Sequence, residues 1–167
     1  ISQRNLTVST CGIVPNMRRL ADEKLQITLA LSLHASSQEK RKTLMPVANK
    51  YALDDVLDAC RYYFEQTGRR ITFEYSLVGG VNDSAEDARE LAALVHDINC
   101  HINLIPVNPI KERDYVQSDN SAIQSFKNKL EKSGINVTIR REMGRDIDGA
   151  CGQLRKSYMD TEKERGE

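Results

Sequence analysis

Five short segments of the chain alternate apolar with polar side chains, which is the pattern of β-strands that bury one face only. In one of them, three leucines alternate with Thr28, Ala30 and Ser32. A strand buried on both faces would instead be a continuous apolar run. The pattern therefore predicts a sheet with one apolar face and one face of small and polar side chains. The expected strands are 6–9, 28–33, 71–77, 102–105 and 135–140.

Three stretches between the expected strands carry apolar residues at helical spacing. Ser84 and Asp87 have the spacing of a capping box, and Gly68 and Gly134 stand where two of the helices should end. Because strands that alternate with helices usually form parallel sheets, we expect an α/β fold with a parallel sheet. The apolar helix faces consist of Leu53, Val56, Leu57, Cys60, Tyr63 and Phe64; of Ala88, Leu91, Ala92 and Val95; and of Ala122, Ile123, Phe126 and Leu130.

Two architectures fit a parallel sheet with one polar face. The first is a two-layer α/β sheet whose polar face meets water. The second is a parallel barrel, complete or partial, whose polar inner face lines a ligand cavity. Five strands are too few to close such a barrel by themselves. In a barrel the carboxyl ends of the strands form the functional end, which would bring together Ser9, Ser32, His34 and Asn108.

The amino-acid composition adds little to the choice between these two architectures. The chain has 167 residues, of which 40% are hydrophobic, and this is enough for the core of one domain. It has 24 basic and 24 acidic residues, so its net charge does not predict nucleic-acid binding. The basic clusters at 40–42 and 140–145 are of a kind that usually forms solvated faces. No segment approaches the roughly 20 apolar residues of a membrane span, and because the first residue is Ile1 we expect a piece of a longer or processed polypeptide.

The four cysteines are widely spaced and form no C-x-x-C pair. This spacing argues against a disulfide scaffold and against a complete metal site within the chain, and we expect a reducing, cytoplasmic setting. Cys60 lies on an apolar helix face and Cys100 leads into a strand, so both are expected to be packing residues. Cys151 differs, because Gly149 and Gly152 lie beside it and would let a large substrate approach closely. A loop thiol without a role is the alternative for Cys151.

Six segments carry distinctive motifs: "VSTCGIVP" (8–15), "LALSLHA" (29–35), "LMPVANKY" (44–51), "FEYSLVGGVND" (73–83), "INLIPVNP" (102–109) and "GRDIDGACGQLR" (144–155). In this order and spacing they resemble the RlmN family of dual-specificity RNA methyltransferases, which are radical S-adenosylmethionine (SAM) enzymes. The resemblance extends over nearly the whole chain. One departure is Cys11, which replaces the serine common in the "STSG" of the family.

The resemblance implies a fold and a division of the chain. Residues 1–142 would form the second half of a partial (βα)6 radical-SAM barrel, with parallel strands and with helices on one face. Residues 143–167 would form a C-terminal segment that carries a methyl-carrier cysteine and ends in a solvated tail. Family members hold a 4Fe–4S cluster on a C-x-x-x-C-x-x-C loop and use a second catalytic cysteine and an acidic proton acceptor. Because the chain lacks these elements, we expect it to be inactive by itself.

The resemblance also implies a reaction and its residues. The family methylates C2 of adenine in 23S rRNA and tRNA through an S-methylcysteine, whose position corresponds to Cys151. Hydroxyl, amide and backbone groups suit the ribose, amino and carboxylate groups of SAM. The implied partners are 23S rRNA, tRNA and an electron donor for the cluster. The SAM-binding positions of the family correspond to Ser9, Ser32, Leu33, His34 and Asn108.

Two other functions stay open at this point. A sister activity methylates adenine at C8 and shares the fold and both cysteines. The motifs "SLH" and "NLIPVNP" favour methylation at C2. A non-catalytic α/β module that binds RNA or oligomerises through an open sheet edge is the alternative from another class. The strand at 6–9 would lack one neighbour and so form an open edge of the sheet, and we expect the chain to self-associate through this edge. We expect no membrane partner.

Overall fold

The computed structural model describes residues 1–107 and 118–140 of the chain. Five strands form one sheet in which all neighbours are parallel and the strand order follows the sequence. This confirms the expected parallel α/β fold, and a sequential strand order is that of a (βα) barrel rather than of a doubly wound sheet. The strands are β1 (Thr7–Thr10), β2 (Thr28–Ser32), β3 (Ile71–Leu77), β4 (Cys100–Pro106) and β5 (Asn136–Ile139).

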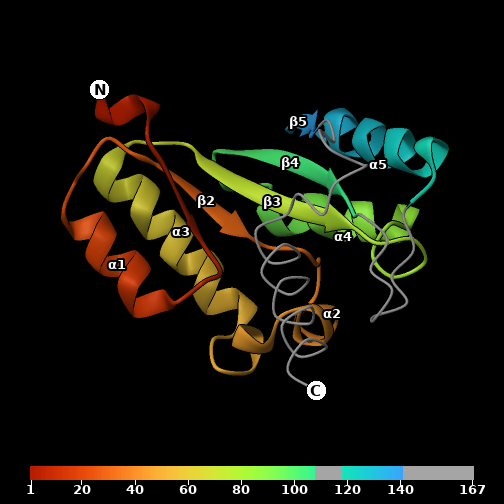
Figure 1. Cartoon of the computed structure of the whole chain (residues 1–167), viewed down its shortest axis with the longest axis horizontal. Coiled ribbons are helices and arrows are strands. Elements are labelled where there is room, and N and C mark those ends of the chain that lie inside the picture. The colour runs from red at the N-terminus through yellow and green to blue at the C-terminus, as the bar shows by residue number, and fades with distance from the viewer. Residues whose placement is uncertain (108–117, 141–167) are drawn as a thin grey trace, which may run out of the picture.

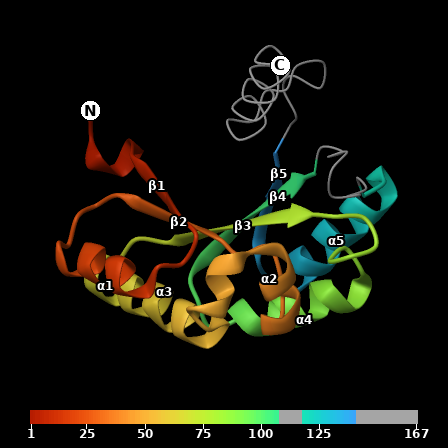
Figure 2. The ribbon, with the colours of Figure 1, turned by 60° about the horizontal axis from the view of Figure 1, so that its bottom comes forward.

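The long helices lie on one face of the sheet, as expected (Figures 1 and 2). The shorter helix α2 lies beyond the end of β2 and follows the loop that leaves this strand (Figure 1). The helices are α1 (Val14–Asp22), α2 (Gln38–Leu44), α3 (Leu53–Thr67), α4 (Ala85–Val95) and α5 (Asn120–Lys132), and single 3-10 turns form at Gln3–Asn5 and Pro46–Asn49.

Helices α1 and α2 were not among the helices expected from apolar spacing. α1 has Pro15 in its first turn, where the missing N–H costs no hydrogen bond, and it buries Met17 and Ala21. α2 has the polar sequence "QEKRKTL" and begins after Ser37, whose hydroxyl accepts the Lys40 N–H at 3.3 Å. Because α2 has no apolar stripe, the Ser37 cap and contacts with the rest of the fold define this helix.

The central strand β3 shows most clearly how the sheet divides its two faces. Its odd-numbered side chains face the helices, where the ring of Tyr75 lies 5.2 Å from that of Phe126 in α5. Burial of one such side chain stabilises the fold by about 1.5–3 kcal/mol. Along β3 the buried residues are Ile71, Phe73, Tyr75 and Leu77, and the half-buried ones are Thr72, Glu74 and Ser76.

The predicted helix ends are confirmed. Ser84 and Asp87 form a reciprocal capping box at the start of α4. Gly68 ends α3 with a φ of 67°, and Gly134 follows α5 with a φ of 80°. Both glycines adopt the left-handed conformation that other residues take up only with strain.

The outer strand β1 differs from the expected pattern. Leu6 and Val8 were expected on the apolar, helix-covered face, but their side chains are 45% and 40% exposed. Within the described residues β1 pairs only with β2, and α1 packs mainly against α3. An edge strand needs a neighbour or helix on its outer side to bury its apolar positions, and the described residues provide none there.

Candidate functional site

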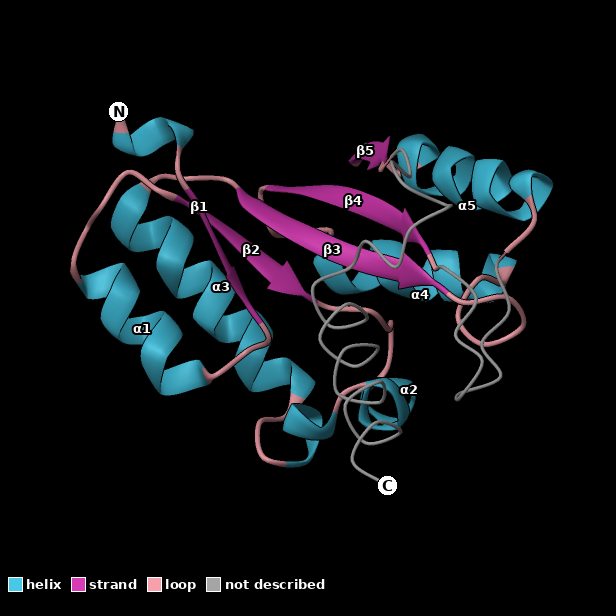
Figure 3. Cartoon of the chain, viewed as in Figure 1, coloured by secondary structure: helices cyan, strands magenta, loops and turns pink. Residues whose placement is uncertain are grey.

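The carboxyl ends of β1 and β2 lie at the same edge of the sheet, where loops leave the strands (Figure 3). Ser9 pairs in register with Ala30, two residues before Ser32, so the two serines point to the same polar face of neighbouring strands. Ser9 is exposed and Ser32 is half-buried. The predicted site residues Asn108 and Cys151 lie outside the described residues.

Leu33 reaches this edge only through its backbone. Its side chain is fully buried in the core, on the helix side of the sheet. Its N–H donates to the carbonyl oxygen of Glu74 at 2.9 Å, and its own carbonyl accepts Nε of Arg41 at 3.2 Å. Both polar backbone groups of Leu33 are therefore already paired within the fold.

His34 follows directly and has an unusual backbone conformation. Its φ is 60°, in the left-handed region that residues other than glycine seldom adopt. Nδ1 of the ring accepts the backbone N–H of Ser76 at 2.9 Å. Burial, and then the positive charge of Arg41, lower the pKa of His34 from 6.5 to about 4. The imidazole is therefore neutral at pH 7.

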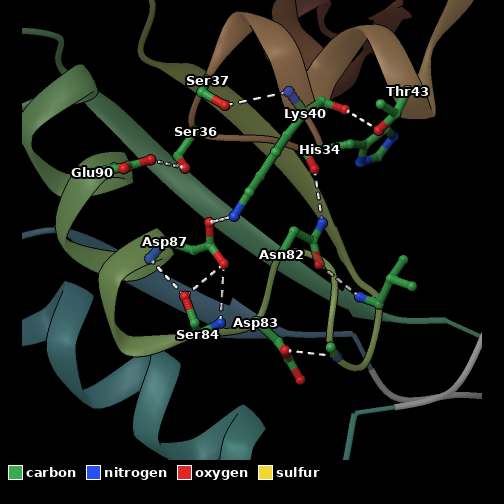
Figure 4. Close-up of polar contacts among 12 residues, drawn as sticks. His34, Ser36, Ser37, Lys40, Thr43, Asn82, Asp83, Ser84, Asp87 and Glu90 are labelled. Atoms are coloured by element: carbon green, nitrogen blue, oxygen red, sulfur yellow. Dashed lines mark hydrogen bonds and ion pairs between the residues drawn. The ribbon is translucent and has the colours of Figure 1, made fainter.

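The buried side chain of Asn82 fixes this conformation from the loop after β3 (Figure 4). Its Nδ2 donates to the carbonyl oxygens of His34 at 2.8 Å and of Ser76 at 2.7 Å, while its Oδ1 accepts the N–H of Val78 at 2.8 Å. The hydroxyl of Tyr75 donates to the Asn82 carbonyl at 2.7 Å. Asn82 thus joins the end of β2 to the end of β3 through bonds that use both of its amide N–H groups and its Oδ1.

Arg41 stabilises the same turn through bonds to other backbone groups. Its side chain is fully buried, and besides the bond to Leu33 its Nη2 donates to the carbonyl oxygens of Cys11 at 2.8 Å and Ser32 at 3.2 Å. Its Nη1 is buried and has no hydrogen-bond partner among the described residues. Arg41 therefore connects the turn after β1 with the turn after β2.

The expectation that the basic residues at 40–42 form a solvated face is wrong for Arg41 and incomplete for Lys40. α2 turns Arg41 toward the ends of β1 and β2, where carbonyl oxygens accept its N–H groups. Lys40 forms an ion pair with Asp87, which is only 2% exposed (Figure 4). Nearby, Ser36 donates to Glu90 at 2.9 Å. These contacts attach α2 and the loop before it to α4.

The polar face continues across β3, β4 and β5 as a row in register. Ser32 pairs with Glu74, Glu74 with Asn103, and Asn103 with Thr138. The Thr138 hydroxyl donates to Oδ1 of Asn103 at 3.2 Å and lies 3.0 Å from Nε2 of His101. Hydrogen-bonding groups thus extend from Ser32 to the opposite edge of the sheet, as the alternation in sequence predicted.

A separate cavity of about 670 Å³ lies near the amino ends of β4 and β5. Arg70, His101 and Lys127 are among the side chains that line it. Its lining includes none of Ser9, Ser32, Leu33 and His34.

The described cysteines do not form a metal site. Burial raises the pKa of Cys60 to about 12 and that of Cys100 to about 11, which keeps both as thiols, in agreement with their expected packing role. In residues 1–107 and 118–140 no group of three His, Cys, Asp or Glu side chains could hold a metal ion. Nor does this part of the chain contain a helix long and apolar enough to cross a membrane.

Arg41, Ser76 and Asn82 were not among the predicted site residues. Asn82 lies within the segment "FEYSLVGGVND", but one letter does not reveal that its amide reaches back to His34. Arg41 lies in the basic run at 40–42, which does not distinguish it from its neighbours. Their contacts are long-range in sequence, and no local pattern marks them.

The chain is similar to known proteins over most of its length, although no family model matches it. It is 71% identical over 160 residues to a probable dual-specificity RNA methyltransferase RlmN from Lachnospira eligens. That match includes 96% of this chain and 46% of the relative. The chain thus spans about half the length of the curated relatives it matches.

Two solved structures have a similar fold. A radical SAM methyltransferase from Sphaerobacter thermophilus superposes with a TM-score of 0.87 and 44% identity, over 92% of this chain and 45% of that one. A domain of a pyruvate-formate lyase-activating enzyme from Bacteroides vulgatus gives a TM-score of 0.61 over 81% of this chain and 80% of that one. At 19% identity, the second similarity concerns the fold alone.

Proposed function

We propose, because the chain belongs to the RlmN family of dual-specificity RNA methyltransferases, that it forms the SAM-binding strand ends of an enzyme that methylates RNA. The substrate would be C2 of adenine in 23S rRNA and tRNA. One observation carries this proposal: Ser9, Ser32 and His34, which lie in motifs that resemble the family, lie toward the carboxyl ends of two neighbouring parallel strands. Ligands of parallel barrels bind at that edge.

The residues at this edge suit SAM. The hydroxyls of Ser9 and Ser32 can each donate and accept hydrogen bonds from a ribose or an amino-acid group. His34 adds a neutral imidazole that is held rigidly, and we propose that the Asn108 side chain completes the set. When bound, SAM supplies the methyl group and the radical chemistry. The protein side chains bind and orient it.

The residues of this chain do not suit the 4Fe–4S cluster. Cluster ligands are thiolates, whereas the Cys60 and Cys100 thiols are buried with raised pKa values. The whole sequence contains four cysteines and no C-x-x-x-C-x-x-C motif. We propose that the cluster, and the electron donor that serves it, depend on residues that the 167-residue sequence does not contain, and that this chain alone does not catalyse methylation.

We propose that Cys151 carries the methyl group, within a C-terminal segment at 143–167 that follows the barrel unit at 1–142. The support is the "DGACGQL" motif around Cys151. A thiol that accepts a methyl group and then meets an RNA base needs close approach from two sides, which glycine neighbours permit. Mass spectrometry of the full-length enzyme should find S-methylation at Cys151, and methylation at Cys11, Cys60 or Cys100 instead would exclude this assignment.

The proposal as a whole is tested with the full-length enzyme and a 23S rRNA fragment. Nucleoside mass spectrometry should detect 2-methyladenosine, and 8-methyladenosine instead would indicate the sister activity. Ser32→Ala should weaken SAM binding by about 1–3 kcal/mol if its hydroxyl is buried against the ligand. Ser37→Ala, which removes a hydroxyl that caps α2, is the matched control and should leave binding nearly unchanged.

A non-catalytic role has one observation in its favour, which is the exposed edge of β1. Leu6 and Val8 present apolar side chains beside a strand that is unpaired on its outer side within the described residues. We propose that the isolated chain self-associates through this edge. A cytoplasmic location, expected from the scattered cysteines, stays a prediction.

A further inference from the structure

We propose that Asn82 is a positioning residue that holds His34 as the neutral tautomer with its proton on Nε2, so that His34 offers its ligand a hydrogen-bond donor and not a base. This inference rests on the proposed SAM site. It concerns one atom of the site, Nε2 of His34, and one residue that the sequence motifs left without a role, Asn82.

The tautomer follows from the hydrogen bond at Nδ1. A backbone N–H can only donate, so the 2.9 Å bond from Ser76 requires an unprotonated Nδ1. In a neutral imidazole the proton must then lie on Nε2. Nε2 makes no hydrogen bond to any described residue, so its N–H is available to an oxygen or nitrogen acceptor of the ligand.

Asn82 maintains this arrangement by binding both partners of that hydrogen bond. Its two amide N–H groups go to the carbonyl oxygens of His34 and Ser76, at 2.8 and 2.7 Å. The two backbones are thereby held at a fixed separation, and the left-handed conformation of His34, with its φ of 60°, is stabilised. Because Asn82 is fully buried, water cannot readily replace it in this bridge.

Arg41 contributes to the same result through bonds to other backbone groups. Its guanidinium donates to the carbonyl oxygens of Ser32 and Leu33, the two residues that precede His34. The buried positive charge of Arg41 opposes a second positive charge on the imidazole of His34. The neutral ring, the fixed tautomer and the fixed backbone therefore have separate structural causes that act together.

The chemical consequence is a restriction on what His34 can do. A ring whose Nδ1 is occupied and whose Nε2 carries the proton cannot take up a proton from the ligand without first breaking the bond to Ser76. It can donate to a ribose oxygen, a carboxylate or a ring nitrogen. His34 would accordingly contribute to binding and orientation, and proton transfer would fall to another group.

The direct test is nitrogen NMR of the full-length enzyme labelled with ¹⁵N-histidine, with the His34 signals assigned by their loss in His34→Gln. At pH 7 we expect an unprotonated Nδ1 and a protonated Nε2, with or without SAM. Protonation at Nδ1, or an imidazolium at this pH, would overturn the inference. This measurement needs neither ligand nor catalysis, so its outcome is independent of whether the proposed function is correct.

The role of Asn82 is tested by Asn82→Asp, which keeps the shape but removes both amide donors and faces two carbonyl oxygens with a carboxylate. We expect the His34 signals to change to a mixture of tautomers or to the imidazolium, and the Kd for SAM to rise about tenfold or more. The matched control is Asn49→Asp, at an exposed asparagine that donates to the Pro46 carbonyl, which should change neither. If Asn82→Asp folds and leaves the His34 tautomer unchanged, Asn82 is not a positioning residue.

Substitution of His34 itself separates a donor from a base. Gln retains an N–H donor at a similar reach and cannot act as a base, so His34→Gln should bind SAM within about threefold of the wild type and keep most of kcat. His34→Leu should bind about tenfold more weakly. If His34→Gln binds SAM normally but loses turnover as completely as a catalytic base would, the donor role is wrong. If no variant and no wild-type protein binds SAM, the proposed function fails while the tautomer result stands.

Discussion

The guanidinium of Arg41 donates a 2.8 Å hydrogen bond to the carbonyl oxygen of Cys11, and so connects α2 to the turn that follows β1. Gly12, the next residue of that turn, lies directly against the same guanidinium. The proposed ligand residues Ser9 and Ser32 are therefore positioned by a buried cation that neither strand contains.

We expect Arg41→Lys to lower the free energy of unfolding by about 2–4 kcal/mol, because one ammonium cannot replace two guanidinium nitrogens that bind three separate carbonyl oxygens. Urea denaturation of the purified protein measures the loss. Arg19→Lys is the control, since Arg19 is exposed and its one side-chain hydrogen bond within residues 1–107 and 118–140 goes to Asn16. Equal effects at both positions would show that the buried contacts of Arg41 add little.

Gly12→Ala should be destabilising by about 2–3 kcal/mol for a steric reason. A methyl group there would lie 3.2 Å from Nη2 of Arg41 and 3.2 Å from the side chain of Val56, and the φ of Gly12 is 103°. Gly80→Ala separates the two causes, because Gly80 also has a positive φ, of 74°, but has no atom within 4 Å of the added methyl. Thermal denaturation should show a clearly larger loss for Gly12→Ala. Similar losses would mean that backbone strain alone, about 1 kcal/mol, decides both.

The Lys40–Asp87 ion pair predicts that the free energy of unfolding depends on pH in the acidic range. Burial of Asp87 opposes its ionisation, but hydrogen bonds from Lys40 and Ser84 outweigh this and hold the pKa of the carboxyl below its ordinary value. Because the folded pKa is lowered, the stabilisation is present above the unfolded pKa of about 3.9 and is lost as the pH falls through the folded value. Urea midpoints should therefore decrease more steeply below pH 4 in the wild type than in Asp87→Asn. Asp97→Asn, at an exposed carboxylate bound to Arg61, is the control and should change stability little.

Local patterns in the sequence were sufficient for the strands and for several ends of α3, α4 and α5. The alternation at 71–77 predicted both ends of β3 correctly, and the Ser84–Asp87 spacing predicted the cap of α4. Each of these signals is formed by residues only a few positions apart in the sequence. Arg41 and Asn82 could not be predicted in this way. Their partners Cys11 and His34 lie 30 and 48 positions away, and only the parallel topology brings these segments together.

The neutral state of His34 predicts a second effect of pH, in a higher range. Its pKa falls from 6.5 in the unfolded chain to about 4 in the folded one, chiefly through burial. The unfolded chain therefore binds the proton more tightly between these values, and the folded state loses stability as the pH falls from about 6.5 toward 4. His34→Gln should flatten the stability profile in this window. His96→Gln, at an exposed histidine, serves as the control, and an unchanged profile in His34→Gln would contradict the assignment.

The edge of β1 predicts how the 167-residue chain behaves in solution. The outer N–H and C=O groups of Thr7–Thr10 have no strand partner among the described residues, and the adjacent Leu6 and Val8 are exposed. Such an edge is a template for pairing with another chain, and a lysine on it opposes pairing by charge. We therefore expect sedimentation velocity to show concentration-dependent association that Val8→Lys reduces. Val81→Lys, at an exposed apolar residue in the loop after β3, introduces the same charge elsewhere and should leave association unchanged. A wild-type chain that stays monomeric at high concentration would show that the exposed edge is tolerated without a partner.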